Sequence, residues 1–261
     1  MSGRTSPALF ADPAHPLAAP LAAWGAASPR FATFLAQHRD KIRKKARGAR
    51  DPEGLDDLFL ELAVARDLHR EWLGEVGYEA QLPGRTRMPD FALTLRNGTT
   101  VMVEVTRLRP AVVVMGAAST GTMPRRAVDP AAVEARLAVL VCGKLGQLVP
   151  NVPNVLIVGL PAELLPALDI GAAMRALLGR AERRELTPRE RHSIHTPLDF
   201  FRPYRHLGGL VVRPWPPPIP PLPPTYWINR QAARAIPARL RACLTAGPDE
   251  HPGGGSSDER G

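Results

Sequence analysis

Asp90 and Glu104 are acidic residues whose sequence surroundings suggest a chemical role. They belong to two segments with strand character, 88–95 and 99–108, joined through an Asn-Gly dipeptide that is a strong β-hairpin signal. Two carboxylates that face each other across a hairpin repel, and a divalent cation between them would remove the repulsion. Mg²⁺ suits such a pair because it favours one or two carboxylates together with water and substrate phosphate. The alternative is a polar, solvent-facing side of an edge hairpin, and the pattern by itself leaves both interpretations open.

The apolar residues of the two segments decide whether the carboxylates face each other. Side chains alternate between the two faces of a strand, and the apolar ones are odd-numbered: Phe91, Leu93, Leu95, Val101, Val103 and Val105. Hydrophobic burial requires all of them on one face, so odd-numbered residues must pair with odd-numbered residues. Even-numbered residues, with Asp90 and Glu104 among them, then share the opposite face.

This requirement selects the length of the hairpin loop. A two-residue loop at 97–98 would pair odd with even numbers and place Phe91 opposite Glu104. A three-residue loop at 96–98 pairs odd with odd numbers and places Asp90 opposite Glu104. We therefore predict the three-residue loop, with the β-carbons of opposed residues roughly 5 Å apart.

The rest of the chain alternates between helical and strand patterns. The periodicity predicts helices over 55–76, 131–148, 161–180 and 231–244, and strands over 78–82, 88–95, 99–108, 155–160, 207–212 and 226–228. Asp129 and Pro130 are expected to begin the second helix as its cap and first turn, and Gly77 to end the first. This order predicts an α/β fold in which one mixed β-sheet is flanked by helices.

Three segments differ in composition. Residues 1–50 are predicted to form an Ala/Pro-rich arm, docking through Leu21 and Trp24, followed by a basic helix. Residues 51–246 are expected to form the α/β domain, and residues 247–261 a Gly/Ser-rich disordered tail.

The charge of the chain suits a polyanionic partner. Lysine and arginine number 34 against 25 aspartates and glutamates, a net charge of +9, and each phosphate that a cation neutralises releases counterions. The candidate nucleic-acid-binding residues are Lys41, Arg43, Lys44, Lys45 and Arg47. The alternatives are an Arg-rich genome for the overall charge and an ordinary solvated face for this run.

Other features bound the compartment and exclude some site types. Cys142 and Cys243 both lie in apolar helical runs, which is typical of buried thiols in a reducing compartment. His192, His195 and His206 lack zinc-site spacing. We see neither a signal peptide nor an apolar run near the ~20 residues that span a bilayer. We therefore expect a cytoplasmic protein without a membrane partner.

Pro89-Asp90, the hairpin and Glu104-Val105-Thr106 together resemble the PD-(D/E)XK nuclease superfamily, which has the restriction-endonuclease-like fold. The order of elements agrees: a helix carrying an acid, the motif hairpin, a helix and a central strand. The resemblance covers about residues 55–160, less than half of the chain.

The resemblance implies a set of site residues. Asp90 and Glu104 would be metal ligands, with Glu61 on the preceding helix as the third acid. Thr106 stands where the family usually has a lysine, and its hydroxyl could orient a water or a phosphate oxygen. Some members carry that lysine on the following helix, where Lys144 is found here. The alternative for Lys144 is an ordinary surface lysine.

The implied chemistry is hydrolysis of phosphodiester bonds in DNA, dependent on Mg²⁺ or Mn²⁺. A second hypothesis is a catalytically degenerate nuclease fold that binds nucleic acid or a protein partner. A third is a plain α/β interaction domain without a metal site. Finding Glu61, Asp90 and Glu104 on different surfaces would favour the third.

Overall fold

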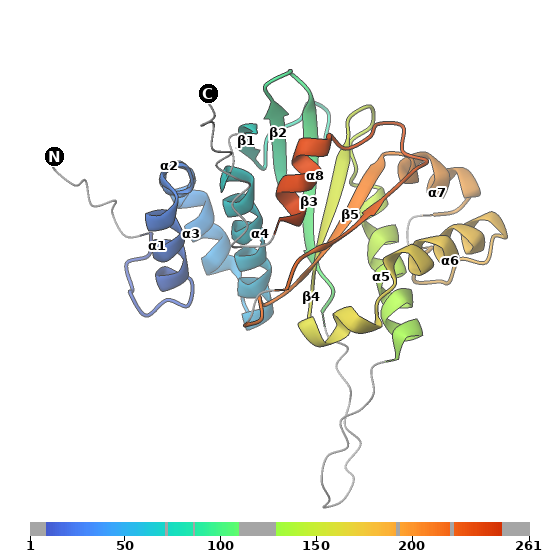
Figure 1. The fold of residues 1–261 in the computed structure, drawn as a ribbon, viewed down its shortest axis with the longest axis horizontal. Helices are drawn as coiled ribbons and strands as arrows, with labels where there is room; N and C mark the ends of the chain where they lie inside the picture. The colour runs from blue at the N-terminus through green and yellow to red at the C-terminus, as the bar shows by residue number, and fades with distance from the viewer. Residues whose placement is uncertain are drawn as a thin grey trace, which may run out of the picture.

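The computed structural model describes residues 9–70, 73–85, 87–109, 129–191, 194–219 and 222–246 (Figure 1). The strands are β1 (Gly74–Tyr78), β2 (Phe91–Leu95), β3 (Thr100–Arg107), β4 (Asn154–Leu160), β5 (Leu207–Pro214) and β6 (Thr225–Ile228). The helices are α1 (Ala18–Ala27), α2 (Pro29–Gln37), α3 (Arg39–Gly48), α4 (Pro52–Arg70), α5 (Pro130–Leu145), the 3₁₀ helix η1 (Ala162–Ala167), α6 (Ile170–Glu182), α7 (Pro197–Tyr204) and α8 (Ala238–Thr245). The predicted α/β class, a mixed sheet flanked by helices, is confirmed.

The strands form one sheet in the order β1-β2-β3-β4-β5-β6. The first three are antiparallel, β4 and β5 lie parallel to β3, and β6 is antiparallel at the far edge. The continuous apolar run of β4 is buried throughout, as expected of a central strand covered on both faces.

Two layers of helices cover the sheet. Helices α1, α2, α3, α4 and α8 share one hydrophobic core with the odd-numbered residues of β2, β3 and β4. Helices α5, α6 and α7 share the other core, which includes Leu156 and Val158 of β4. Figure 1 shows the two layers on either side of the sheet. Because side chains alternate along a strand, residues of β3 can reach either α4 or α5 according to the parity of their numbers.

The predicted hairpin register is confirmed. Phe91 pairs with Val103 and Leu93 with Val101, and all these side chains are fully buried. The loop contains a left-handed Gly98, with a φ of +79°, which a three-residue hairpin loop requires. The strands are shorter than predicted at their outer ends.

The first long helix ends earlier than predicted. Helix α4 stops at Arg70. Residues 74–78, predicted to be the end of this helix and the start of the strand over 78–82, form β1 instead. A Cβ atom at Gly74 would lie 2.0 Å from the carbonyl oxygen of Thr94, so a glycine is needed for this strand to approach β2. Pairing with β2 therefore outweighs the helical pattern, and Gly77 is a strand residue rather than a helix cap. Trp72, part of the predicted apolar stripe, lies outside the described residues.

The N-terminal segment is more ordered than a loose arm. Residues 18–27 form α1, whose Leu21 is buried and whose Trp24 stacks on Phe59 with ring centroids 4.9 Å apart. The predicted docking through these two residues is thus confirmed. The basic stretch forms the separate helix α3, and the tail at 247–261 lies outside the described residues.

The C-terminal half differs from prediction in three places. Residues 197–204, for which the periodicity predicts neither helix nor strand, form α7, and a capping box between Thr196 and Asp199 begins this helix. The helix predicted over 161–180 is divided into η1 and α6, with Pro166 inside η1. The last helix begins only after Pro237, since proline breaks the preceding helical pattern. His192 lies outside the described residues. No helix in the described ranges has the length and apolar character to cross a bilayer.

Candidate functional site

The site is centred on Asp90 and Glu104. Asp90 directly precedes β2, and continuing the hairpin register places it opposite Glu104 of β3. Its carboxylate accepts a hydrogen bond from the backbone N–H of Val105 at 2.7 Å, so the start of β2 is tied to β3 beside Glu104. Glu104 itself is buried, with 8% of its surface exposed. The two acids therefore lie at one place in the sheet.

The pKa of Asp90 shows that the acids interact. Burial and the charges of Glu61 and Glu104 together raise that pKa to about 8, although the Val105 N–H opposes the effect. Glu61 lies on α4 and is also buried. The structure thus brings the three predicted acids into one electrostatic cluster, in which Asp90 interacts with both of the others.

Lys144 contacts Glu104 from the opposite layer of helices. It lies in the last turn of α5, and its Nζ donates to Glu104 Oε1 at 2.7 Å and to Gln147 Oε1 at 3.3 Å. It is therefore not an ordinary surface lysine. Thr106, two residues after Glu104, is partly exposed on the same side of β3. A cationic side chain accordingly reaches the site even though residue 106 is a threonine.

A second lysine forms an ion pair with Glu61. Lys45 of α3 donates to both carboxylate oxygens of Glu61, at 2.6 and 2.9 Å, and pairs with Glu79 at 2.6 Å. Burial alone would lower the pKa of Lys45, but Glu61 and Glu79 outweigh burial and raise it. Lys41 also pairs with Glu79, at 3.3 Å. The two lysines hold α3 against the acidic cluster.

The predicted nucleic-acid-binding run on α3 divides into two sets. Lys41 and Lys45 make the inward ion pairs, and Arg43 donates to the backbone carbonyl of Leu9. Lys44 and Arg47 are exposed on the other side of the helix. Only these two present their charges outward. The sequence pattern could not separate the sets because α3 is basic on both sides.

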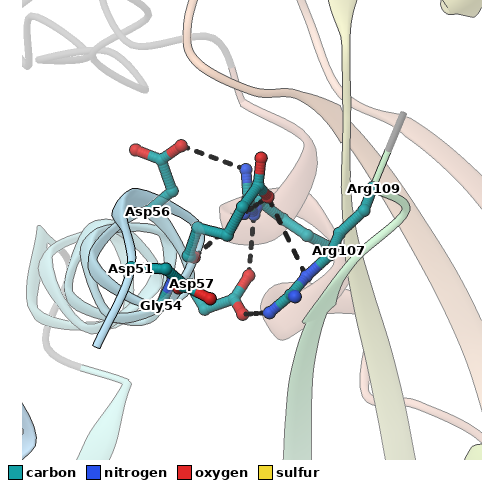
Figure 2. Close-up of polar contacts among 7 residues, drawn as sticks. Asp51, Gly54, Asp56, Asp57, Arg107 and Arg109 are labelled. Carbon is teal, nitrogen blue, oxygen red and sulfur yellow. Dashed lines mark hydrogen bonds and ion pairs between the residues drawn. The ribbon is translucent and has the colours of Figure 1, made fainter. Parts of the chain in front are cut away.

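An ion-pair network that sequence reasoning missed joins α4 to β3 (Figure 2). The side chain of Arg107 is only 8% exposed and donates to Asp57 at 2.7 Å, to Asp56 at 3.2 Å and to the carboxylate and carbonyl of Glu53. Arg109 also donates to Asp57. We call this network the α4–β3 clasp. The acidic start of α4 and the arginines that follow the Glu104 motif were its signals in the sequence.

The clasp has a consequence for the site. Arg107 follows Glu104 by three residues on β3, and the acids that bind it precede Glu61 on α4. Because both elements are held by one buried guanidinium, the clasp sets how α4 lies along β3. It therefore contributes to the spacing between Glu61 and Glu104.

The acids do not form a closed metal cage. Across the described ranges, no three or more His, Cys, Asp or Glu side chains are grouped closely enough to hold a metal ion together. The bonds of Lys45 and Lys144 to Glu61 and Glu104 leave Asp90 as the acid of the cluster without a lysine contact among the described hydrogen bonds and ion pairs.

The fold and the site define an α/β protein in which acids from a helix and a hairpin meet a lysine from the opposite helix layer. No known protein family, curated protein or solved structure matches this chain.

Proposed function

We propose that this protein is a Mg²⁺-dependent nuclease of the PD-(D/E)XK type that hydrolyses phosphodiester bonds in DNA. The observation that carries the proposal is the contact of Lys144 with Glu104, opposite Asp90. It supplies from α5 the cation that the motif lacks at Thr106. Two acids and one lysine are the site residues that the resemblance implies.

The order of elements supports the same proposal. The chain runs α4, three antiparallel strands β1, β2 and β3, then α5 and the parallel strand β4. The first helix carries Glu61, the β2–β3 hairpin carries the acid pair and the second helix carries the lysine. This order of elements supports the restriction-endonuclease-like arrangement that the resemblance implies.

The residues fit a divalent cation by their chemistry. All three acids offer hard oxygen donors. The pKa of Asp90 is raised by burial and by the charges of Glu61 and Glu104, and a divalent cation would relieve the repulsion between these charges. Asp90 and Glu104 would hold Mg²⁺ or Mn²⁺, with Glu61 nearby and the remaining positions left to water and phosphate. When bound, the ion polarises a phosphoryl oxygen and lowers the pKa of water.

The side chains of the protein supply the remaining functions. Lys144 has three N–H donors and uses two of them on Glu104 and Gln147. The third can donate to a phosphate oxygen, where it stabilises developing negative charge. The Thr106 hydroxyl can orient a water or a second phosphate oxygen from its position on the same side of β3.

The test is cleavage of single- and double-stranded DNA by the purified chain with Mg²⁺ or Mn²⁺. We expect Asp90→Asn and Glu104→Gln to reduce the rate at least about 100-fold, and Lys144→Gln by about 10²-fold or more. Arg230→Gln is the control, because Arg230 is exposed just after β6 at the opposite edge of the sheet. Undiminished cleavage in both acid variants would contradict the proposal.

A second candidate function rests on the ion pairs. Lys45 and Lys144 already neutralise Glu61 and Glu104, so most of the negative charge of the cluster is balanced without a metal ion. This favours a catalytically degenerate nuclease fold that binds nucleic acid. Salt-sensitive DNA binding without turnover at any Mg²⁺ or Mn²⁺ concentration would establish it in place of the nuclease.

A further inference from the structure

A pocket lies between the β1–β2 connection and the end of α5. Its volume is about 330 Å³, and it is lined by Gly84, Arg85, Arg87, Gly146 and Gln147. Two of these five residues are arginines and no acid lines the pocket. A Cβ atom at either glycine would meet nothing within 4 Å. Because the two glycines have no side chains, the space beside them in the pocket is free for a ligand group.

Arg85 is held in a fixed orientation. Its guanidinium donates to the carbonyl oxygens of Gln147 at 2.7 Å and Leu148 at 3.1 Å, just after the end of α5. These bonds use two of its five N–H donors, so further donors are available to a ligand. A guanidinium whose position is already fixed loses little entropy when it binds an anion.

Arg87 adds a second guanidinium, and it is exposed. Two arginines with free N–H donors are suited to the planar, paired hydrogen bonds that a phosphate accepts. A carboxylate would need only one guanidinium. The pair of arginines in an open pocket therefore favours a phosphate group.

The positive surroundings extend beyond the pocket. The pKa of His206, at the start of β5, is lowered by burial and by the charges of Arg202, Arg205 and Arg85. Arg85 is thus close enough to influence the turn between α7 and β5. The pocket belongs to a basic surface on the α5 side of the sheet.

The pocket adjoins the candidate site through one side chain. Gln147 lines the pocket and accepts a hydrogen bond from Lys144, which also donates to Glu104. Arg87 precedes Asp90 by only three residues. Successive phosphates along a DNA strand are separated by about 3.4 Å of helix axis. A strand that reaches Glu104 therefore brings further phosphates close to this pocket.

We propose that the pocket binds a backbone phosphate of the nucleic acid, next to the phosphate held at Asp90 and Glu104. This assignment rests on the proposed function, because it takes the substrate to be a polynucleotide. The pocket then sets the direction in which the strand leaves the acid pair. Arg87 provides the binding charge, and Arg85 both binds and fixes the wall formed by the end of α5.

The experiment measures the binding of a short, fluorescently labelled DNA duplex by anisotropy over a range of salt concentrations, without Mg²⁺. We expect Arg87→Gln to weaken binding several-fold and to reduce the slope of log K against log salt by about 0.9, the value for one lost phosphate contact. Arg230→Gln, an equally exposed arginine at the other edge of the sheet, should change neither quantity. Unchanged binding and slope in Arg87→Gln would overturn the proposal.

Two further outcomes separate the pocket from the proposed function. If Arg87→Gln weakens DNA binding but the wild-type chain cleaves no DNA, the pocket stands and the hydrolytic function fails. Inorganic phosphate is the second probe, read as a rise in Tm of the wild-type chain and of Arg87→Gln. A rise only in the wild-type chain, together with no binding of DNA, would assign the pocket to free phosphate and overturn the backbone assignment.

Discussion

Asp90 is the residue of the candidate site whose ionisation is unfavourable in the folded chain. The free energy of unfolding therefore depends on pH. The pKa of Asp90 is raised to about 8 in the folded chain, against about 3.9 in an unfolded one. Between these values the folded state binds more protons than the unfolded state. The free energy of unfolding therefore falls as pH rises from about 4 to about 8, and then levels off.

Asp90→Asn should remove this dependence, because an amide does not titrate and can still accept the hydrogen bond from Val105. We expect the variant to gain stability over the wild-type chain as pH rises, with the largest gain above about pH 8. Urea unfolding across this pH range measures the effect. Asp40→Asn, at an exposed position in α3, is the control. If the free energies of unfolding of the wild-type chain and Asp90→Asn change in parallel with pH, the titration of Asp90 is not the cause of the pH dependence.

Lys45 and Lys44 are neighbours in sequence with opposite structural roles. Lys45→Met should lower the free energy of unfolding by about 2 kcal/mol, since it leaves the buried carboxylate of Glu61 without its cation. Lys44→Met should change it by less than about 0.5 kcal/mol, because Lys44 is exposed. Chemical denaturation of the two variants provides the comparison. Equal losses would mean that the pairing with Glu61 is not stabilising.

At the residue scale, the sequence predicted which side chains of the hairpin face each other, because side chains alternate between the two faces of a strand. The alternation of Phe91 and Leu93 with their neighbours was enough to place Asp90 opposite Glu104, and the resemblance to the nuclease superfamily named Lys144 on the following helix. The contact of Lys45 with Glu61 could not be predicted. It depends on how α3 packs on α4: Ile42 and Ala46 are the buried residues of α3, but they do not indicate which residue of α4 lies opposite Lys45.

At the scale of elements, the α4–β3 clasp holds the two elements that carry Glu61 and Glu104. Arg107→Met should lower the free energy of unfolding by about 2 kcal/mol. The side chain of Arg107 is only 8% exposed, and its replacement leaves several carboxylates without the guanidinium that pairs with them. Those carboxylates are 40–50% exposed, which keeps the loss below that of a fully buried pair.

Arg109→Met is the matched variant for the clasp. Arg109 contacts the same Asp57 but is 52% exposed, so its replacement should cost less than about 1 kcal/mol. Urea denaturation at low and high salt measures both variants, and salt should weaken the Arg109 pair more than the Arg107 network. Similar losses in both variants would contradict a clasp centred on Arg107.

The elements themselves were predictable where one physical effect dominated. The buried strand β4 follows from its continuous apolar run, and α5 from the Asp129 cap, which accepts from the backbone N–H of Ala131. The boundary between α4 and β1 was not predictable. The helical stripe continues through Leu73, and only the pairing of Gly74 with β2 shows where the strand begins.

At the scale of the whole molecule, the net charge is +9, but some of the cations are already paired with acids inside the fold. On the α4 side, Lys41 and Lys45 neutralise acids, and Lys44 and Arg47 of α3 are exposed. On the α5 side, the cations surround the pocket near Lys144. The number of positive residues therefore overstates the charge available to DNA, and the two exposed sets can be tested separately.

The double variant Lys44→Gln/Arg47→Gln should reduce the salt slope of DNA binding by up to about 1.8, which corresponds to two phosphate contacts. Because α3 and the pocket lie in different layers, its effect on binding free energy should add to that of Arg87→Gln in the triple variant. Anisotropy titrations over the same salt range measure all three variants. A slope that the double variant leaves unchanged would mean that the exposed face of α3 is only solvated. DNA would then be bound from the α5 side alone, where Lys144 and the arginine pocket adjoin the acid pair.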